Sequence, residues 1–367
     1  MIEILPAKLY HPIFLILSAI LTIYYYSQLQ QGIGLNNKKR GYGIMLFYAI
    51  AFIIVVGLRP VSGFYFGDTS NYAHVFNIMA DGDLIPDKSE DEWIFSRLMW
   101  WSAQCMDVQL FFLIIEILYI VPILIACKKL CPMNPAVMML FFMTAFSFFS
   151  YGTNGIRNGM ACSLVILAIA YASDKRFIGK IIAALLVFIA YECHKSIVLP
   201  IASMIVCLFF KNTRLIIYFW ILSIGISLVA GGSVEAFFTS LGFDDRMSEY
   251  SSSNVDESLF SSTGFRWDFL LYSAMPIILG WYAIFKRGIV SEKYSYLLNI
   301  YILCNAFWVM MIRASYSNRF AYLSWFIYPI VLAYPLLNFK VFKKGNNQKV
   351  ALILIAHTAF TIIMSFM

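Results

Sequence analysis

Long apolar runs alternate with short polar segments along almost the whole chain. A helix that crosses a bilayer needs about 20 apolar residues, and these runs are of about that length. The stretch 177–210 is interrupted by Glu192, His194 and Lys195, so it fits either one span or two shorter ones, 177–191 and 197–210. The other runs lie at 10–27, 43–58, 108–127, 134–151, 156–172, 215–231, 268–286, 295–312, 320–338 and 350–367. The pattern predicts an all-α polytopic membrane protein.

Composition excludes the main alternatives. The 367 residues are 61% hydrophobic and only 13% charged, whereas soluble domains carry about 25% charged residues. A soluble fold would expose too much apolar surface, and a disordered chain would need far more polar residues. The seven cysteines form no Cys-x-x-Cys pair, so we expect neither a disulfide framework nor a cysteine metal site.

The distribution of charge decides how 177–210 is divided. With two spans there, every second connection is basic, and these connections hold 17 of the 27 Lys and Arg residues but only Asp174 and Glu292 among the acids. A single span would move the last three basic connections to the acidic side, against the positive-inside rule. We therefore predict about 12 transmembrane helices in a single integral membrane domain, 1–367, with both termini on the extracytoplasmic side. Two longer external loops, 59–107 and 232–267, follow from this topology.

The net charge of +7 is thus an orientation signal, and we expect no nucleic-acid partner. Several basic residues nevertheless fall at span ends on the predicted external face, against that rule. They are Arg59, Arg157, His194 with Lys195, Arg266, Arg313 and Arg319. Snorkelling at the membrane surface explains any one of them, but a group of them at one face indicates a functional site.

The hairpin at His194 is predicted to lie deep. Residues 181–210 supply about 45 Å of helix, whereas two full crossings need about 60 Å. The turn at 192–196 is therefore expected below the outer surface, lining a cavity in the membrane. Arginine binds phosphate through two parallel hydrogen bonds, so the external arginines point to a lipid-borne anion such as a polyprenyl diphosphate. Nearby carboxylates, Asp68, Glu92 and Glu192, are suited to orient a sugar hydroxyl or take its proton.

Five segments, in order, resemble the EpsG family of exopolysaccharide polymerases, which are Wzy-like membrane proteins. They are GLRPVSGFYFGDTSNY at 57–72, DEWIFSRL at 91–98, GIRNGMACSL at 155–164, AYECHKSIVLP at 190–200 and SNRFAYL at 317–323. The resemblance covers about 60–330. Asn158 stands where the family usually has Gln, which questions a direct contact by that side chain.

The resemblance implies a GT-C-like membrane bundle in the bacterial cytoplasmic (inner) membrane, with its active face periplasmic or extracellular. It would join oligosaccharide repeat units carried on undecaprenyl diphosphate, which serves as donor and as acceptor, for exopolysaccharide, capsule or O-antigen biosynthesis. A chain-length regulator and a flippase are candidate partners. No cofactor or metal is expected, because arginines can stabilise the departing diphosphate.

Residue roles follow from the same resemblance. His194 is the expected general base, with Asp68 or Glu92 as the other candidates. Contacts to the diphosphate are assigned to Arg59, Arg157, Arg319 and Lys195. Contacts to sugar or lipid are assigned to Tyr72, Asn158, Arg266, Arg313 and Tyr322.

Three other functions stay open at this point. A lipid-linked glycan ligase needs the same diphosphate site. A transporter of the lipid-linked unit would need charges near the membrane midplane, where Glu116 is the visible acid. A scaffold would use the external loops only to bind partners.

Overall fold

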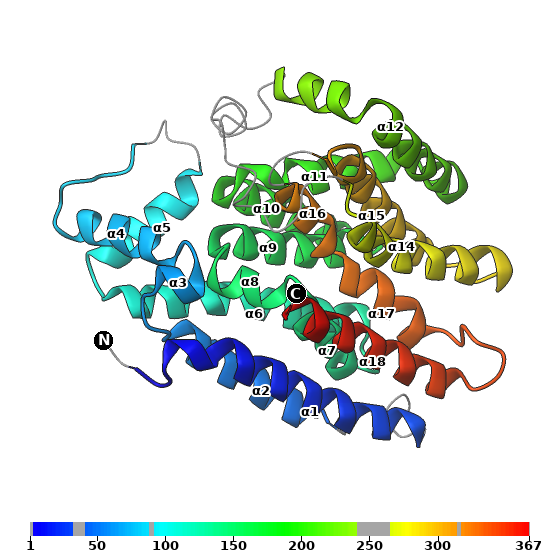
Figure 1. Ribbon diagram of the computed structural model, residues 1–367, viewed down its shortest axis with the longest axis horizontal. Coiled ribbons are helices and arrows are strands. Elements are labelled where there is room, and N and C mark those ends of the chain that lie inside the picture. The colour runs from blue at the N-terminus through cyan, green and yellow to red at the C-terminus, as the bar shows by residue number, and fades with distance from the viewer. Residues whose placement is uncertain (1–2, 32–40, 88–91, 241–264, 314–316, 367) are drawn as a thin grey trace. The chain divides into compact units, whose positions relative to one another are not determined.

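The computed structural model describes residues 3–31, 41–87, 92–240, 265–313 and 317–366, with the side chains of 233–240 and 318 left out (Figure 1). All regular structure in these ranges is helical. The longer helices are α1 (Tyr10–Gln30), α2 (Tyr42–Gly57), α4 (Thr69–Ala80), α5 (Trp93–Ala103), α6 (Val108–Leu130), α9 (Ile156–Ala172), α10 (Phe177–Cys193), α11 (Val198–Phe209), α12 (Thr213–Ser240), α14 (Trp267–Trp281), α15 (Glu292–Met310), α17 (Tyr328–Asn338) and α18 (Asn346–Met364). The shorter ones are η1 (Ala7–Leu9), α3 (Gly63–Phe66), α7 (Pro135–Met143), α8 (Phe148–Thr153), η2 (Lys195–Ile197), the π-helix η4 (Tyr282–Lys286) and α16 (Asn318–Trp325).

The apolar runs form helices, as predicted. Six helices in the described ranges are long and apolar enough to cross a membrane, namely Ala7–Gln30, Val108–Leu130, Thr213–Gly232, Trp267–Lys286, Arg319–Asn338 and Asn346–Met364. Shorter apolar helices cover Tyr42–Gly57, Ile156–Ala172 and Lys195–Phe209. The polytopic membrane class is therefore supported, while the number of 12 crossings and the side of each terminus stay predictions.

The predicted span 134–151 is not one helix. It divides into α7 and α8 around residues 144–147, and side-chain hydroxyl groups bind two carbonyl groups beside the break. Thr361 donates to the Thr144 carbonyl at 2.7 Å, and Tyr119 donates to the Phe148 carbonyl at 2.9 Å. Irregular backbone at membrane depth persists where protein groups satisfy it in this way.

The predicted external loop 59–107 is also more ordered than expected, since it contains α3, α4 and α5. The Ser62 hydroxyl accepts the Tyr65 N–H at the start of α3, and the Asp107 carboxylate accepts the Leu110 N–H at the start of α6. Such caps satisfy backbone donors that a helix start leaves unpaired. The other predicted loop, 232–267, includes the end of α12, and its residues 241–264 lie outside the described ranges.

Contacts divide the chain into two compact units. Unit 1 contains Met1–Ile201 and Ala333–Met367, and unit 2 contains Ala202–Leu332. In unit 1, α9 packs between α6 and α10, α1 packs on α18, and α2 packs on α6. In unit 2, the main pair is α12 with α15, which also contacts α14 and α16. Both units hold membrane-length helices, and a single integral membrane domain stays a prediction.

Within unit 1, segments predicted on the same side of the membrane lie together. Lys129 lies in the last turn of α6 and Asp174 follows α9, and their side chains form an ion pair at 2.9 Å. Both belong to predicted cytoplasmic connections. At the other end of the unit, α3, α4 and α5 form a group (Figure 1). The alternation of sides itself stays a prediction.

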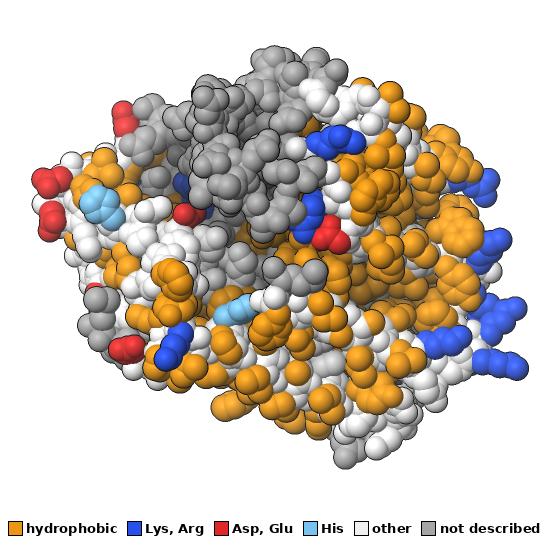
Figure 2. Space-filling model, viewed as in Figure 1, with side chains coloured by type: hydrophobic (Ala, Val, Ile, Leu, Met, Phe, Trp, Pro, Cys, Tyr) orange, Lys and Arg blue, Asp and Glu red, His pale blue; other side chains and the backbone are white. Residues whose placement is uncertain are grey.

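Exposed apolar side chains cover the outer helix faces of the protein. They include Ile20 of α1, Phe47 of α2 and Phe188 of α10, each more than half exposed. Figure 2 shows hydrophobic side chains over much of the drawn face. A surface of this kind is unfavourable in water but suits the hydrocarbon core of a bilayer.

We expect a membrane-impermeant maleimide to label Cys105 in intact cells. Cys105 is exposed and lies in the predicted external segment, whereas the other six cysteines are buried. Labelling should disappear in Cys105→Ser. In that background Lys175→Cys, at an exposed predicted cytoplasmic position, should react only after permeabilisation. The reverse result would invert the assigned sides.

Candidate functional site

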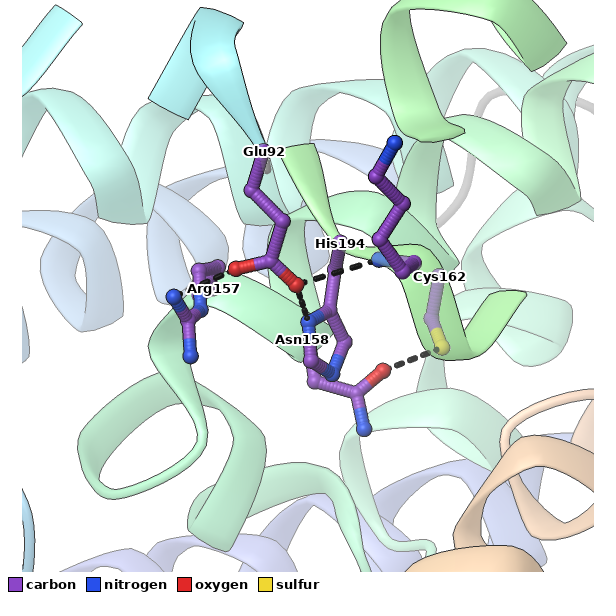
Figure 3. Close-up of polar contacts among 6 residues, drawn as sticks. Glu92, Arg157, Asn158, Cys162 and His194 are labelled. Carbon is purple, nitrogen blue, oxygen red and sulfur yellow. Dashed lines mark hydrogen bonds and ion pairs between the residues drawn. The ribbon is translucent and has the colours of Figure 1, made fainter. Parts of the chain in front are cut away.

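A carboxylate at the start of α5 joins three predicted external segments of unit 1 (Figure 3). Glu92 Oε2 forms an ion pair with Arg157 Nη1. The other oxygen, Oε1, lies 2.5 Å from His194 Nδ1 and accepts the backbone N–H of Lys195 at 3.1 Å. We call these four residues the Glu92 cluster.

Each member of the Glu92 cluster occupies a helix end. Arg157 is the second residue of α9, His194 follows the last residue of α10 in extended backbone, and Lys195 opens η2. Glu92 precedes α5 with a φ of 62°, the one positive φ at a residue other than glycine in the described ranges. Such strain persists only where surrounding contacts hold it, and it concentrates at functional sites. Here the contacts to Arg157, His194 and Lys195 provide that hold.

The surroundings of Glu92 stabilise its charged form. Burial by itself raises the pKa of the carboxyl group, but the hydrogen bond and charge of His194, the charge of Arg157 and the Lys195 N–H outweigh it. The pKa is lowered from its ordinary value to about 2. Glu92 is therefore an ionised hydrogen-bond acceptor at neutral pH, and so weak a base does not suit the proton-accepting role that we considered for it.

The contact with Glu92 also fixes the orientation of the His194 ring. A carboxylate can only accept a hydrogen bond, so Nδ1 carries a hydrogen, and Nε2 is the basic nitrogen whenever the ring is neutral. The His194 side chain is 19% exposed, which leaves part of it within reach of a bound molecule. This geometry is the one by which a carboxylate orients a general base.

The helix that follows Glu92, α5, also supplies an aromatic ring that lies beside Arg157. Phe95, one turn after Glu92, is buried and lies 5.7 Å from the Arg157 guanidinium carbon. Tyr72 of α4 packs edge-on against Phe95 at 6.0 Å. Thus α5 provides both the charge and the ring that fix Arg157, and Tyr72 contributes through packing.

Asn158 and Lys195, two other predicted site residues, make side-chain contacts of their own. Asn158 accepts a hydrogen bond from Cys162 Sγ at 3.2 Å, one turn further along α9. Lys195 Nζ lies over the Tyr191 ring at 4.3 Å, while its backbone N–H binds Glu92. Both residues lie beside the cluster, and their contacts with substrate stay predictions.

Arg59 differs from the expectation. Its side chain is 0% exposed, and its guanidinium donates to the carbonyl groups of Val56 at 2.8 Å and Thr153 at 3.2 Å. The group also lies 4.7 Å from the centre of the Phe112 ring. A direct contact with a diphosphate does not fit this buried position, because the chain after α2 turns the side chain inward.

Asp68, the other predicted base candidate, is exposed at the start of α4. Its backbone N–H donates to Asn154 Oδ1 at 2.8 Å. The side chain makes none of the contacts that define the Glu92 cluster. Asn154 is not among the predicted site residues, although a polar residue three positions before Arg157 was an available signal.

The remaining predicted residues belong to unit 2. Arg266 forms two hydrogen bonds with Asp268, at 3.0 and 2.7 Å. Arg313 is exposed with its guanidinium 5.8 Å from the Phe265 ring, Arg319 is exposed, and Tyr322 packs against Trp325. A site shared by these residues and Arg157 stays a prediction.

No group of three or more His, Cys, Asp or Glu is placed to hold a metal ion in the described ranges. The polar groups brought together in unit 1 are instead one carboxylate, one imidazole and one guanidinium. Together they can accept a proton and bind an anion.

Comparison with known proteins assigns the chain to a family. The EpsG family model matches residues 43–367. The chain belongs to the EpsG family. This match includes the whole Glu92 cluster, and membership indicates a membrane polysaccharide polymerase. No curated protein and no solved structure matches the chain.

We expect Glu92→Gln to destabilise this EpsG-family protein in detergent by about 2 kcal/mol at neutral pH, because hydrogen bonds to charged groups are lost. The folded-state pKa of Glu92 lies below its ordinary value. Its contribution is therefore complete above the unfolded-state pKa and disappears as pH falls toward about 2. Thermal unfolding midpoints of variant and wild type should converge over that interval.

Glu192→Gln is the matched control, since Glu192 is two residues from His194 and forms no ion pair within the described part of the chain. It should leave the midpoint near that of wild type at every pH. Equal loss in both variants would contradict the special role of Glu92.

Proposed function

We propose that this EpsG-family protein lengthens a polysaccharide at the Glu92 cluster, using repeat units carried on undecaprenyl diphosphate. The observation that carries the proposal is the 2.5 Å contact of His194 Nδ1 with Glu92, on a carboxylate that also binds Arg157. A base and a cation are thereby held beside each other. A base assists attack by the acceptor hydroxyl, and a cation assists departure of the diphosphate.

In the proposed reaction, His194 Nε2 takes the proton from a hydroxyl of the acceptor sugar. The hydroxyl oxygen forms a bond to the anomeric carbon of the donor chain, while the bond from that carbon to the lipid diphosphate breaks. The diphosphate leaves with the bonding electrons. Glu92 stabilises the imidazolium that forms, as a carboxylate does beside a histidine base.

Arg157 would stabilise the negative charge that develops on the leaving diphosphate. A guanidinium carries five N–H donors, Arg157 uses Nη1 for Glu92, and its side chain is 21% exposed, so donors remain beyond the one that Glu92 occupies. A fixed cation stabilises this transition state more than the ground state, because the charge grows as the bond breaks. Lysine cannot reproduce the two parallel hydrogen bonds that arginine offers.

The proposal places this chemistry on the extracytoplasmic face of a bacterial inner membrane. The acidic and aromatic character of 59–107 and the basic character of the opposite connections support that face. A chain-length regulator and a flippase that delivers the repeat unit are proposed partners. Arg319 of unit 2 is proposed to contact the lipid diphosphate, and Arg266, Arg313 and Tyr322 are proposed to contact lipid or sugar.

The test is reconstitution of the purified protein in vesicles with its lipid-linked repeat unit, followed by a gel of the products. We expect a ladder spaced by one repeat. His194→Ala should lower the rate about 10² to 10⁴-fold, the usual contribution of a general base. Arg157→Ala should abolish the ladder, and Arg157→Lys should restore little of it.

Arg176→Ala is the control, because Arg176 is largely exposed in a predicted cytoplasmic connection; its ladder should match that of wild type. One addition without a ladder would indicate a ligase. Movement of the lipid-linked unit across the vesicle without transfer would indicate a transporter. Full activity of Arg157→Lys would contradict the two-hydrogen-bond role of Arg157.

A further inference from the structure

The connection between α8 and α9 is held by residues that lie about 85 to 95 positions earlier in the chain. The Thr153 carbonyl accepts hydrogen bonds from Arg59 Nη2 at 3.2 Å and from the Thr69 hydroxyl at 2.9 Å. Asn154 Oδ1 accepts the Asp68 backbone N–H at 2.8 Å. Three donors from 59–69 therefore fix Thr153, the last residue of α8, and Asn154, the residue that follows it.

Gly67 brings the two segments close enough for these contacts. Its φ is +55°, and a Cβ added there would lie 2.2 Å from Asn154 Oδ1 and 2.5 Å from Asn154 Cγ. A real Cβ cannot approach so closely. The glycine is thus needed both for the backbone conformation and for the space that Asn154 fills.

Arg59, one of the three donors, is fully buried. Its side chain is completely enclosed and is held by the Val56 carbonyl and the Phe112 ring, and it interacts electrostatically with Glu116. Glu116 is itself 1% exposed. A Cβ on Gly152 would lie 2.9 Å from Glu116 Oε1, so the residue preceding Thr153 also leaves room for the Glu116 side chain.

We propose that Arg59, Gly67 and Thr69 are positioning residues, which act on the reaction by fixing residues 153–154 and thereby Arg157. Arg157 lies three residues after Asn154, about one helical turn, so a displacement of the connection moves the start of α9. A shift of about 1 Å at a reacting group can lower a rate about 100-fold. This inference rests on the proposed function of Arg157 and gives Arg59 a role other than binding the diphosphate.

Gly67→Ala tests the proposal, with Gly82→Ala as the matched control. Gly82 also has a positive φ, +85°, but a Cβ there meets nothing within 4 Å. We expect Gly67→Ala to lower kcat in the reconstituted assay about 10 to 100-fold with a smaller change in KM for the donor, because Arg157 acts on the departing charge. Gly82→Ala should stay within about two-fold of wild type, since its substitution adds only backbone strain.

Two further variants separate positioning from general destabilisation. Asn154→Ala removes the atoms that a Cβ at position 67 would meet, and it also removes the hydrogen bond to Asp68, so Gly67→Ala should lower kcat less in the Asn154→Ala background than in wild type. In the Arg157→Lys background, which keeps a low rate, Gly67→Ala should lower that rate little further, because residues that act through one another are not additive. Fully additive losses in both backgrounds would overturn the proposal.

Hydrogen exchange of residues 153–158 supplies a readout that does not depend on activity. Gly67→Ala should speed exchange there, and Gly82→Ala should not. If exchange changes but neither Gly67→Ala nor Arg157→Ala affects transfer, the proposed function fails while the positioning contacts stand. If Arg157→Ala abolishes transfer and Gly67→Ala behaves like Gly82→Ala in both assays, the positioning role fails.

Discussion

The arrangement of the candidate site depends on the contacts that the Glu92 carboxylate makes. It binds the side chains of Arg157 and His194 and the backbone of Lys195, and these groups come from segments about 65 to 100 residues away in the chain. Without it, a guanidinium and an imidazole in a poorly solvated place would lack their negative partner. Removing one partner from such a group leaves an uncompensated charge, which is strongly unfavourable.

A second set of polar contacts in unit 1 is centred on Arg59. Arg59 is fully buried and interacts with Glu116 and the Thr153 carbonyl, whereas Arg157 is 21% exposed and pairs with Glu92. Two arginines that look equivalent in the sequence therefore differ in access to solvent. Access decides which of them a bound anion can reach, and the exposed one carries the proposed chemistry.

The break between α7 and α8 illustrates how the same unit tolerates irregular backbone. Hydroxyl groups of Tyr119 and Thr361 bind the carbonyl groups of Phe148 and Thr144, on the two sides of the break. The Thr153 carbonyl, at the end of α8, is held in the same manner by Arg59 and Thr69. Side-chain donors thus bind carbonyl groups at these three positions, and the last of them lies just before α9.

The sequence by itself determined the helical membrane class, the places of the helices and the residue types of the site, because apolar length and charge are local properties of the chain. It also singled out Glu92, Arg157 and His194 as candidates. Only the tertiary structure decided that Glu92 orients His194, that Arg59 is enclosed, and that 134–151 is broken. Those outcomes depend on contacts with residues far away in the sequence, such as the hydrogen bond from Arg59 to the Thr153 carbonyl. The burial of a side chain is decided by such distant residues, because they are the ones that enclose it.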